Sequence, residues 1–280
     1  MTDNKSKKKI KVLILCAGES TRWGNYLGLP KQLISFNGEP LLKRTVRLLN
    51  DQRCYDIMII SHNEQLQLSN CGFFKPPKHR WTVETLLSTY PLWSERTIIL
   101  LGDVSFMEKA ISKITNTVEG IHVYGRPGPS RYTFKIHGEI FAISFNKKNW
   151  DQIVANAETA ICNAEKGGRG KLWQLYRSLA GYPLKRHRIE KEIFTPIHDL
   201  TDDIDDPKEY KKLVKMLTCA TSTNRYKRIL ILYNWLILGL TDSRPYLKNC
   251  FKYYIEKPFK RSKLKAFLDT LNSINQSNVS

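Results

Sequence analysis

Residues 13–24 read Leu-Ile-Leu-Cys-Ala-Gly-Glu-Ser-Thr-Arg-Trp-Gly, and Pro-Lys-Gln-Leu follows at residues 30–33. The apolar run that contains the start of this stretch extends from Ile10 to Cys16 and includes β-branched residues. Gly18 closes the run. A short apolar run of this kind, bounded by a glycine, predicts a buried parallel strand that leads into a loop.

The loop after this strand has the composition of a phosphate-binding loop. Gly18 allows a positive φ and lets the backbone approach a ligand closely, and backbone N–H groups of such a loop can point at phosphate oxygens. Arg22 supplies a fork of donors, and Lys31 supplies a mobile point charge, both suited to phosphate. The sequence therefore predicts an anion site at the end of the first strand.

Strand-like and helix-like segments alternate along the chain from this point. Strands are expected at 10–16, 56–61, 97–101, 120–124 and 139–144, and helices at 40–49, 83–90, 107–114, 149–165 and 171–179. The alternation predicts an α/β fold, with a mainly parallel central sheet and helices on both faces. Ligands of such sheets bind beyond the carboxyl ends of the strands.

Acidic residues lie at two places in the chain where a metal site is expected. Asp103 follows directly after an apolar strand, and a carboxylate there faces the ligand crevice. Asp203 and Asp205 are two residues apart in the acidic segment 201–210, so both face the same side of an extended stretch. Mg²⁺ prefers oxygen ligands and takes one or two carboxylates together with substrate phosphates. We expect Asp206 and Glu209 to help start the following helix, where negative charge is favourable.

Residues 13–42 resemble the N-terminal motif of the nucleotidyltransferases related to sugar-1-phosphate nucleotidyltransferases, molybdopterin-cofactor guanylyltransferases and phosphocholine cytidylyltransferases. The positions that carry the resemblance are Gly18, Ser20, Arg22, Gly24, Pro30, Lys31, Leu33, Gly38, Pro40, Leu41 and Leu42. Cys16 stands where alanine is usual in that family, and Ser20 where many members have a second glycine. The resemblance implies a Rossmann-like nucleotidyltransferase fold of the GT-A kind.

The resemblance also implies roles for individual residues. Arg22 and Lys31 are the implied catalytic residues, and Mg²⁺ is implied on Asp103, with Asp203 and Asp205 completing its shell. Residues implied to hold the nucleotide are Leu15, Ala17, Gly18 and Ser20 of the first loop, with Thr82 and Thr85 of a later segment in which Trp81 replaces the usual glycine. The candidates for contacts to the acceptor are Glu139, Arg126 and Arg131.

The activity that the resemblance implies is the Mg²⁺-dependent transfer of NMP from an NTP to a small phosphorylated acceptor, such as a sugar 1-phosphate or phosphocholine, with release of pyrophosphate. Such reactions serve sugar nucleotide biosynthesis. The alternatives are a GT-A glycosyltransferase and a non-catalytic basic protein that binds nucleotides or nucleic acid. A glycosyltransferase of that class needs a mid-domain Asp-x-Asp, whereas residues 103–105 read Asp-Val-Ser.

Residues 167–171 superficially look like a second phosphate loop. They read Gly-Gly-Arg-Gly-Lys, but Leu172 stands where a Walker motif has the Ser or Thr that binds Mg²⁺. We interpret them as a turn that precedes a helix, with a second phosphate site as the alternative.

The chain of 280 residues carries a formal net charge of +19. Much of the excess lies at the two ends, because residues 1–11 hold five Lys and one Asp, and residues 221–280 hold eleven Lys or Arg and three Asp or Glu. A field of this sign attracts polyanions, but no nucleic-acid-binding motif accompanies it, so specific nucleic-acid binding is not expected. None of the six cysteines forms a C-x-x-C pair, which favours a reducing, cytoplasmic location.

These patterns predict three parts of the chain. Residues 1–9 form a basic disordered tail, residues 10–217 the nucleotidyltransferase domain, and residues 218–280 a basic helical extension. The apolar run 229–240 in the extension is shorter than the ~20 residues that a membrane helix needs, so no transmembrane segment is expected. We expect this run to pack on the domain or to form a homodimer through the C-terminal helices, with a membrane-surface helix as the alternative.

Overall fold

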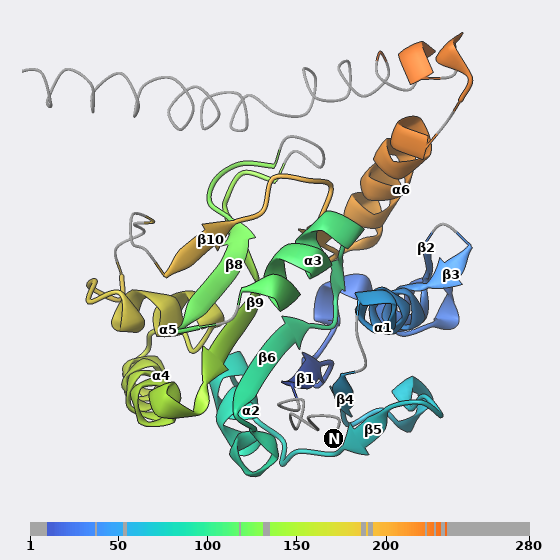
Figure 1. Ribbon diagram of the computed structural model, residues 1–280. Helices are drawn as coiled ribbons and strands as arrows, with labels where there is room; N and C mark the ends of the chain where they lie inside the picture. Colours follow the sequence, from blue (N-terminus) through green and yellow to red (C-terminus); the bar gives the residue numbers. More distant parts are fainter. Residues whose placement is uncertain are drawn as a thin grey trace, which may run out of the picture.

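The computed structural model describes residues 10–36, 38–52, 55–117, 119–130, 135–185, 189, 193–221, 223–226, 228–230 and 233. Its central sheet has seven strands (Figure 1), which are, in spatial order, β10 (Phe194–Pro196), β8 (His122–Arg126), β9 (Glu139–Asn146), β6 (Arg96–Leu101), β1 (Ile10–Leu15), β4 (Asp56–Ile60) and β5 (Gly72–Phe74). Both neighbours of β9 run antiparallel to it, and the other strand pairs of this sheet are parallel. The predicted α/β fold with a mainly parallel sheet is confirmed.

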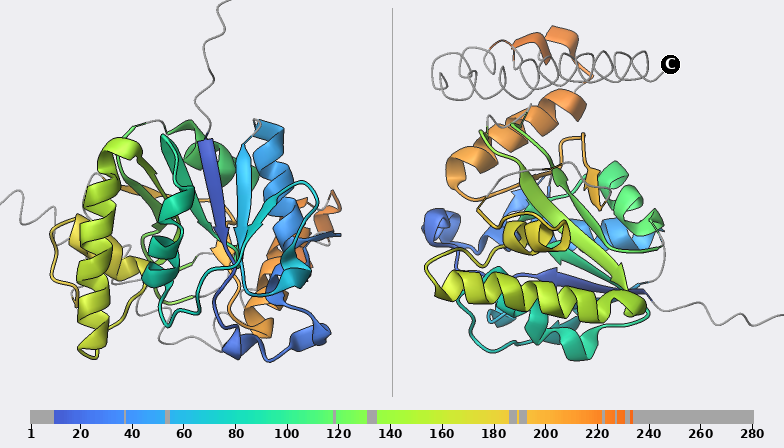
Figure 2. Two further views of the ribbon diagram at one scale, coloured as in Figure 1. Left: turned by 90° about the horizontal axis from the view of Figure 1, so that it is seen from below. Right: turned by 90° about the vertical axis from the view of Figure 1, so that its left-hand side faces the viewer.

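Helices cover both faces of the sheet (Figure 2). The helices of the described residues are α1 (Leu41–Gln52), α2 (Thr82–Ser88), α3 (Glu108–Asn116), α4 (Trp150–Glu165), α5 (Leu172–Leu179) and α6 (Pro207–Thr221). Helices α1 and α3 pack on the face to which Val12 and Ile14 of β1 point, and α2, α4 and α5 pack on the face of Leu13 and Leu15. Since successive side chains of a strand point to opposite faces, a continuous apolar run is what a strand between two helical layers requires.

A third apolar cluster joins α6 to the loop after β1. Its buried members are Trp23, Ile34, Phe36, Leu41, Ile204, Leu213 and Leu217. The indole Nε1 of Trp23 donates to the carbonyl of Leu29 over 2.8 Å, and the hydroxyl of Tyr210 on α6 donates to the carbonyl of Ser35 over 2.6 Å. This cluster packs α6 beside the first loop from its start as far as Leu217.

Two pairs of short strands complete the fold. Strands β2 (Ser35–Phe36) and β3 (Glu39–Pro40) form one antiparallel pair. Strands β7 (Val104–Ser105) and β11 (Asp202–Asp203) form the other. The second pair brings the late acidic segment to the end of β6.

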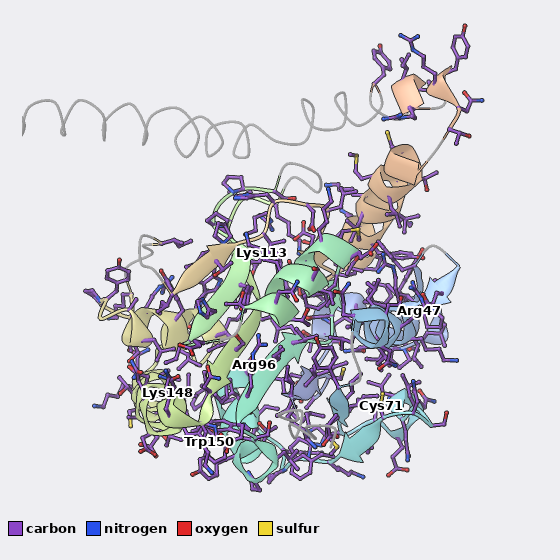
Figure 3. The ribbon with its side chains drawn as sticks, in the orientation of Figure 1. Arg47, Cys71, Arg96, Lys113, Lys148 and Trp150 are labelled. Atoms are coloured by element: carbon purple, nitrogen blue, oxygen red, sulfur yellow. The ribbon has the colours of Figure 1, made fainter. Side chains whose placement is uncertain are left out.

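Arg96, labelled in Figure 3, ties β6 to α3 at the opposite end of the strand. This arginine is 6% exposed, and its guanidinium donates to the carbonyls of Ile114 and Thr115 over 3.0 and 2.8 Å. The last carbonyls of a helix lack partners within the helix, and a cation there is favourable. The contact therefore anchors the C-terminal end of α3 to the sheet.

The ten segments that the alternation predicts all appear, with ends shifted by a few residues at most. The sequence did not predict β5 and β10, which are three residues long and lie at the two edges of the sheet. Helix α6 continues to Thr221, past the predicted domain boundary at 217. The predicted tail 1–9 lies outside the described residues.

Most of the predicted extension 218–280 also lies outside them. Of the apolar run 229–240, Ile229, Leu230 and Tyr233 are described, and all three are exposed. No helix in the described part of the chain is both long and apolar enough to cross a membrane.

Candidate functional site

A cavity of about 610 Å³ lies at the edge of the sheet where β1 and β6 end and the antiparallel β9 begins. Its lining comes from segments far apart in the sequence. The residues singled out by the sequence that line it are Leu15, Ala17, Gly18, Arg22, Lys31, Thr82, Thr85, Asp103, Glu139, Asp203 and Asp205. The fold thus brings most of the predicted site residues to one place.

Two glycines shape the entrance to this cavity. Gly18 does not adopt a positive φ, and a Cβ added to it would meet nothing within 4 Å. Its contribution is therefore open space in front of the loop. A Cβ at Gly102 would collide with Cys16 and lie 2.9 Å from the carbonyl oxygen of Leu15. Glycine at that position lets the end of β6 pass close to the first loop, which places Asp103 beside it.

The cations of the first loop pair with the predicted metal carboxylates. Lys31 Nζ lies 2.6 Å from Asp103 Oδ2 and 4.0 Å from Asp205 Oδ1. Arg22 Nη2 lies 2.7 Å from Asp205 Oδ2. The Lys31 side chain is 9% exposed, whereas that of Arg22 is 63% exposed. An exposed ion pair contributes little stability, so the guanidinium of Arg22 can leave Asp205 for another anion at small cost.

The carboxylates of Asp203, Asp205 and Glu209 each place an oxygen within 4.8 Å of the others. Asp203 pairs with Val104 in the β7–β11 ladder, and the N–H of Ile204 donates to the carbonyl of Asp103 over 2.9 Å. These backbone bonds hold the late acidic segment against the residue that ends β6.

Asp203 sits in an unusual electrostatic environment. Burial by itself would raise the pKa of Asp203, but the charge of the Lys135 ammonium and its hydrogen bond to the carboxylate outweigh burial and hold that pKa at about 2. Burial, reinforced by the charge of Asp203, raises the pKa of Glu139 to about 8 and raises that of Asp205 as well. The raised pKa values of Glu139 and Asp205 follow from the burial of several carboxyl groups close to one another.

The donor set fits a hard divalent cation. Asp203 Oδ1 is buried and has no hydrogen-bond partner among the described residues, and it belongs to the carboxyl group that lines the cavity. A buried oxygen without a partner is costly, and carboxylate oxygens are the ligands that Mg²⁺ and Ca²⁺ prefer. Asp103 is linked to this group through Lys31, which contacts both Asp103 and Asp205.

Two of the predicted site residues that the structure describes, Ser20 and Arg126, do not line this cavity. Ser20 lines a neighbouring cavity of about 450 Å³ on the first loop. Arg126 is 8% exposed, and its guanidinium contacts Asp202 Oδ1 over 3.0 Å and donates to two backbone carbonyls. Because Asp202 and Asp203 are adjacent on one strand, they point to opposite sides, and Asp202 holds Arg126 away from the cavity. Arg131 lies outside the described residues.

The structure adds two residues to the acidic side of the site. Lys135, which no local pattern singled out, contacts Asp203 Oδ2 over 2.6 Å and Glu209 Oε2 over 3.1 Å. The expected role of Asp206 and Glu209 at the start of α6 is also observed: Asp206 accepts from the N–H of Glu209 over 2.9 Å, and Glu209 accepts from that of Asp205 over 2.8 Å. In the sequence, the short spacing between Asp205 and Glu209 was the one signal that could have placed Glu209 beside the acidic residues of the site.

The wall opposite the first loop is aromatic and basic. It is formed by residues that the sequence did not assign to the site, namely His79, Arg80, Trp81, Lys171 and Trp173. The N–H of Val83 donates to the carbonyl of Gly170 over 3.2 Å, so the starts of α2 and α5 lie side by side. Residues 167–171 precede α5 as expected, and Lys171 lines the cavity.

Comparisons with known proteins agree with this geometry. Residues 12–123 match the family model of the MobA-like NTP transferase domain. No curated protein matches the chain.

Three solved structures share the fold. A candidate glucose-1-phosphate thymidylyltransferase from Bacillus anthracis has 16% identity and a TM-score of 0.50 over 78% of this chain and 98% of its own. The CTP:phosphocholine cytidylyltransferase from Streptococcus pneumoniae has 16% identity and a TM-score of 0.50 over 75% and 99%. The inositol-1-phosphate CTP transferase from T. maritima has 12% identity and a TM-score of 0.50 over 75% and 97%.

Proposed function

We propose that this chain, of which residues 12–123 match the MobA-like NTP transferase domain, transfers NMP from an NTP to a small phosphorylated acceptor in a Mg²⁺-dependent reaction that releases pyrophosphate. The observation that carries the proposal is the single cavity in which the first loop, Asp103 and the pair Asp203 and Asp205 meet. A binding protein without activity has no need of carboxylates beside the cations that would hold a triphosphate.

In this proposal the first loop holds the phosphates of the NTP. Ala17, Gly18 and Glu19 of this loop line the cavity, and Thr82 and Thr85 of α2 lie on its wall to hold the nucleoside. Arg22 and Lys31 exchange their carboxylate partners for phosphate oxygens as the triphosphate binds. They then stabilise the charge that builds on the departing pyrophosphate.

Asp103, Asp203 and Asp205 are the residues that would hold Mg²⁺. When bound, the ion would supply neutralisation of the negative charge on the phosphates. An oxygen of the acceptor phosphate attacks the α-phosphorus as the bond to pyrophosphate breaks. Since that oxygen is already ionised near pH 7, the residues of the chain position it and need not remove a proton from it.

The acceptor is proposed to lie against the aromatic and basic wall. Arg80 and Lys171 are exposed cations on that wall, and Trp81 and Trp173 offer flat apolar surfaces. The guanidinium of Arg80 lies 5.1 Å from the centre of the Trp81 ring, a contact that orients it. Glu139, at the start of β9, is placed to accept a hydrogen bond from an acceptor hydroxyl.

The test is a matrix of the four common NTPs against sugar 1-phosphates and phosphocholine, with pyrophosphate release as the readout. We expect one base and one acceptor class to give release that depends on Mg²⁺ and stops in EDTA. Failure of every pair would contradict the proposal. Release of a nucleoside diphosphate from a nucleotide sugar would assign the chain to the glycosyltransferases instead.

A further inference from the structure

Lys135 is a buried cation that uses all its hydrogens on the acidic cluster. Its Nζ contacts Asp203 Oδ2 over 2.6 Å and Glu209 Oε2 over 3.1 Å, and it donates to the carbonyl oxygen of Asp203 over 3.0 Å. A lysine ammonium has three donors, and these contacts account for three. The Lys135 side chain is 10% exposed.

The charge on this lysine is secured by its neighbours. Burial alone would lower the pKa of Lys135, but the carboxylates of Asp203, Asp202 and Glu209 together raise it above its ordinary value.

Lys135 stands behind the carboxylates, whereas the other cations stand in front of them. Arg22 and Lys31 line the cavity, but neither Lys135 nor Glu209 is among the residues that line it. Asp203 lies between the two regions: Oδ2 contacts Lys135, and Oδ1 is the buried oxygen without a described partner. Lys135 can therefore affect a ligand in the cavity only indirectly, through its contact with Asp203.

We propose that Lys135 is a positioning residue that serves as the internal counter-ion of the metal-binding carboxylates, holding them together without a divalent cation and thereby weakening the affinity of the nucleotide-free enzyme for that cation. The inference rests on the proposed role of Asp203 and Asp205 as metal ligands. It extends that role, because it predicts that the metal enters mainly with the NTP and does not occupy the free enzyme.

The physical reason is competition for one set of negative charges. In the wild type, the ammonium already neutralises Asp203 and Glu209 and occupies one oxygen of each. An entering cation therefore meets carboxylates whose negative charge is already partly neutralised by the ammonium. When the lysine charge is removed, the freed oxygens and the unbalanced negative charge both favour the metal.

The experiment is a titration of nucleotide-free protein with Mn²⁺, followed by electron paramagnetic resonance of the unbound ion. We expect Lys135→Met to bind Mn²⁺ roughly tenfold or more tightly than the wild type, the scale for removal of a near-contact charge from a partly buried site. Lys135→Arg keeps the charge and is expected to bind like the wild type. Lys147→Met removes a lysine from an exposed pair with Glu95 and serves as the control.

Thermal unfolding gives a second readout. In EDTA, Lys135→Met is expected to unfold at a lower temperature than the wild type, and saturating Mn²⁺ is expected to raise its Tm by more than it raises that of the wild type. Should Lys135→Met be insoluble, Lys135→Gln, which retains a polar side chain, takes its place in both measurements.

Equal or weaker Mn²⁺ binding by the uncharged variants would overturn the inference while leaving the proposed metal site in place. Tighter binding by Lys135→Arg as well would overturn it too, since the charge would then not be the cause. If the wild type and all variants fail to bind Mn²⁺ even with an NTP present, both the inference and the proposed metal site are wrong.

Discussion

Single residues at the end of β6 determine where the acidic side of the site lies. Gly102 allows β6 to approach the loop after β1, so that Asp103 comes within 2.6 Å of Lys31. The backbone carbonyl of the same aspartate accepts from Ile204, which draws Asp203 and Asp205 to it. Asp103 thus links the three segments on which the proposed chemistry depends.

We predict that Asp103→Asn lowers kcat at saturating Mg²⁺ by at least about 10²-fold, the scale for loss of one preorganised charged contact in a transition state. The fold is expected to be retained, because the Asp103 side chain is 27% exposed and Lys31 keeps Asp205 nearby. Steady-state pyrophosphate release and circular dichroism are the measurements. Asp151→Asn, an exposed position on α4, is the control, and wild-type turnover in the Asp103 variant would contradict the assignment.

At the scale of elements, the sheet depends on contacts between the ends of helices and the strands beneath them. Arg96 at the start of β6 holds the last carbonyls of α3. At the start of α6, Asp206 accepts from the N–H of Glu209 in the first turn, and Glu209 accepts from the N–H of Asp205, two residues before the helix. These side chains satisfy backbone groups that a helix cannot satisfy internally.

We predict that Arg96→Met lowers the free energy of unfolding by about 2 kcal/mol, the scale for hydrogen bonds to a charged group in the interior. Methionine retains the apolar stem, so the loss reports on the guanidinium. Urea unfolding monitored by circular dichroism measures it. Lys113→Met is the control, because Lys113 lies on α3, the helix that Arg96 contacts, and donates to the carbonyl of Pro196 from an exposed position. An equal loss of unfolding free energy in both variants would refute a special role for Arg96.

At the scale of the whole molecule, the three apolar clusters and the cavity all lie within residues 10–221. The third cluster needs α6, since Leu213 and Leu217 belong to it. The boundary predicted at 217 therefore falls within a helix that the domain requires. For the apolar run 229–240 beyond it, the expected packing on the domain or homodimer contact can be tested separately from catalysis by truncation.

We predict that a chain ending at Thr221 retains wild-type kcat, because every described residue of the proposed site is still present. A chain ending at Asp206 is expected to lose soluble expression or activity, because it lacks Glu209 and the α6 part of the third cluster. Pyrophosphate release compares the two. Light scattering of the longer truncation and the full chain tests the homodimer, since equal masses per particle would exclude dimerisation through residues 222–280.

Local pattern alone determined the layered fold and predicted the position of a phosphate loop. The continuous apolar run from Ile10 to Cys16 can be satisfied only between two helical layers, and the spacing of Asp203 and Asp205 places both on one side of an extended chain. The mainly parallel direction of the strands also followed, since alternating strands and helices favour parallel neighbours. These features depend on residues close together in the sequence, where periodicity carries the information.

Only the tertiary structure decided which charges meet. Lys135 and Asp203 are 68 positions apart, and Arg126 and Asp202 are 76 apart. No spacing rule connects such residues. Arg126, a candidate for the acceptor phosphate by sequence, is instead held by Asp202, while Lys135, without a motif around it, contacts Asp203. The pairing is set by the antiparallel course of β9 and the docking of β11 on β7. The sequence cannot show it, because electrostatic contacts depend on distance in space and leave no periodic pattern along the chain.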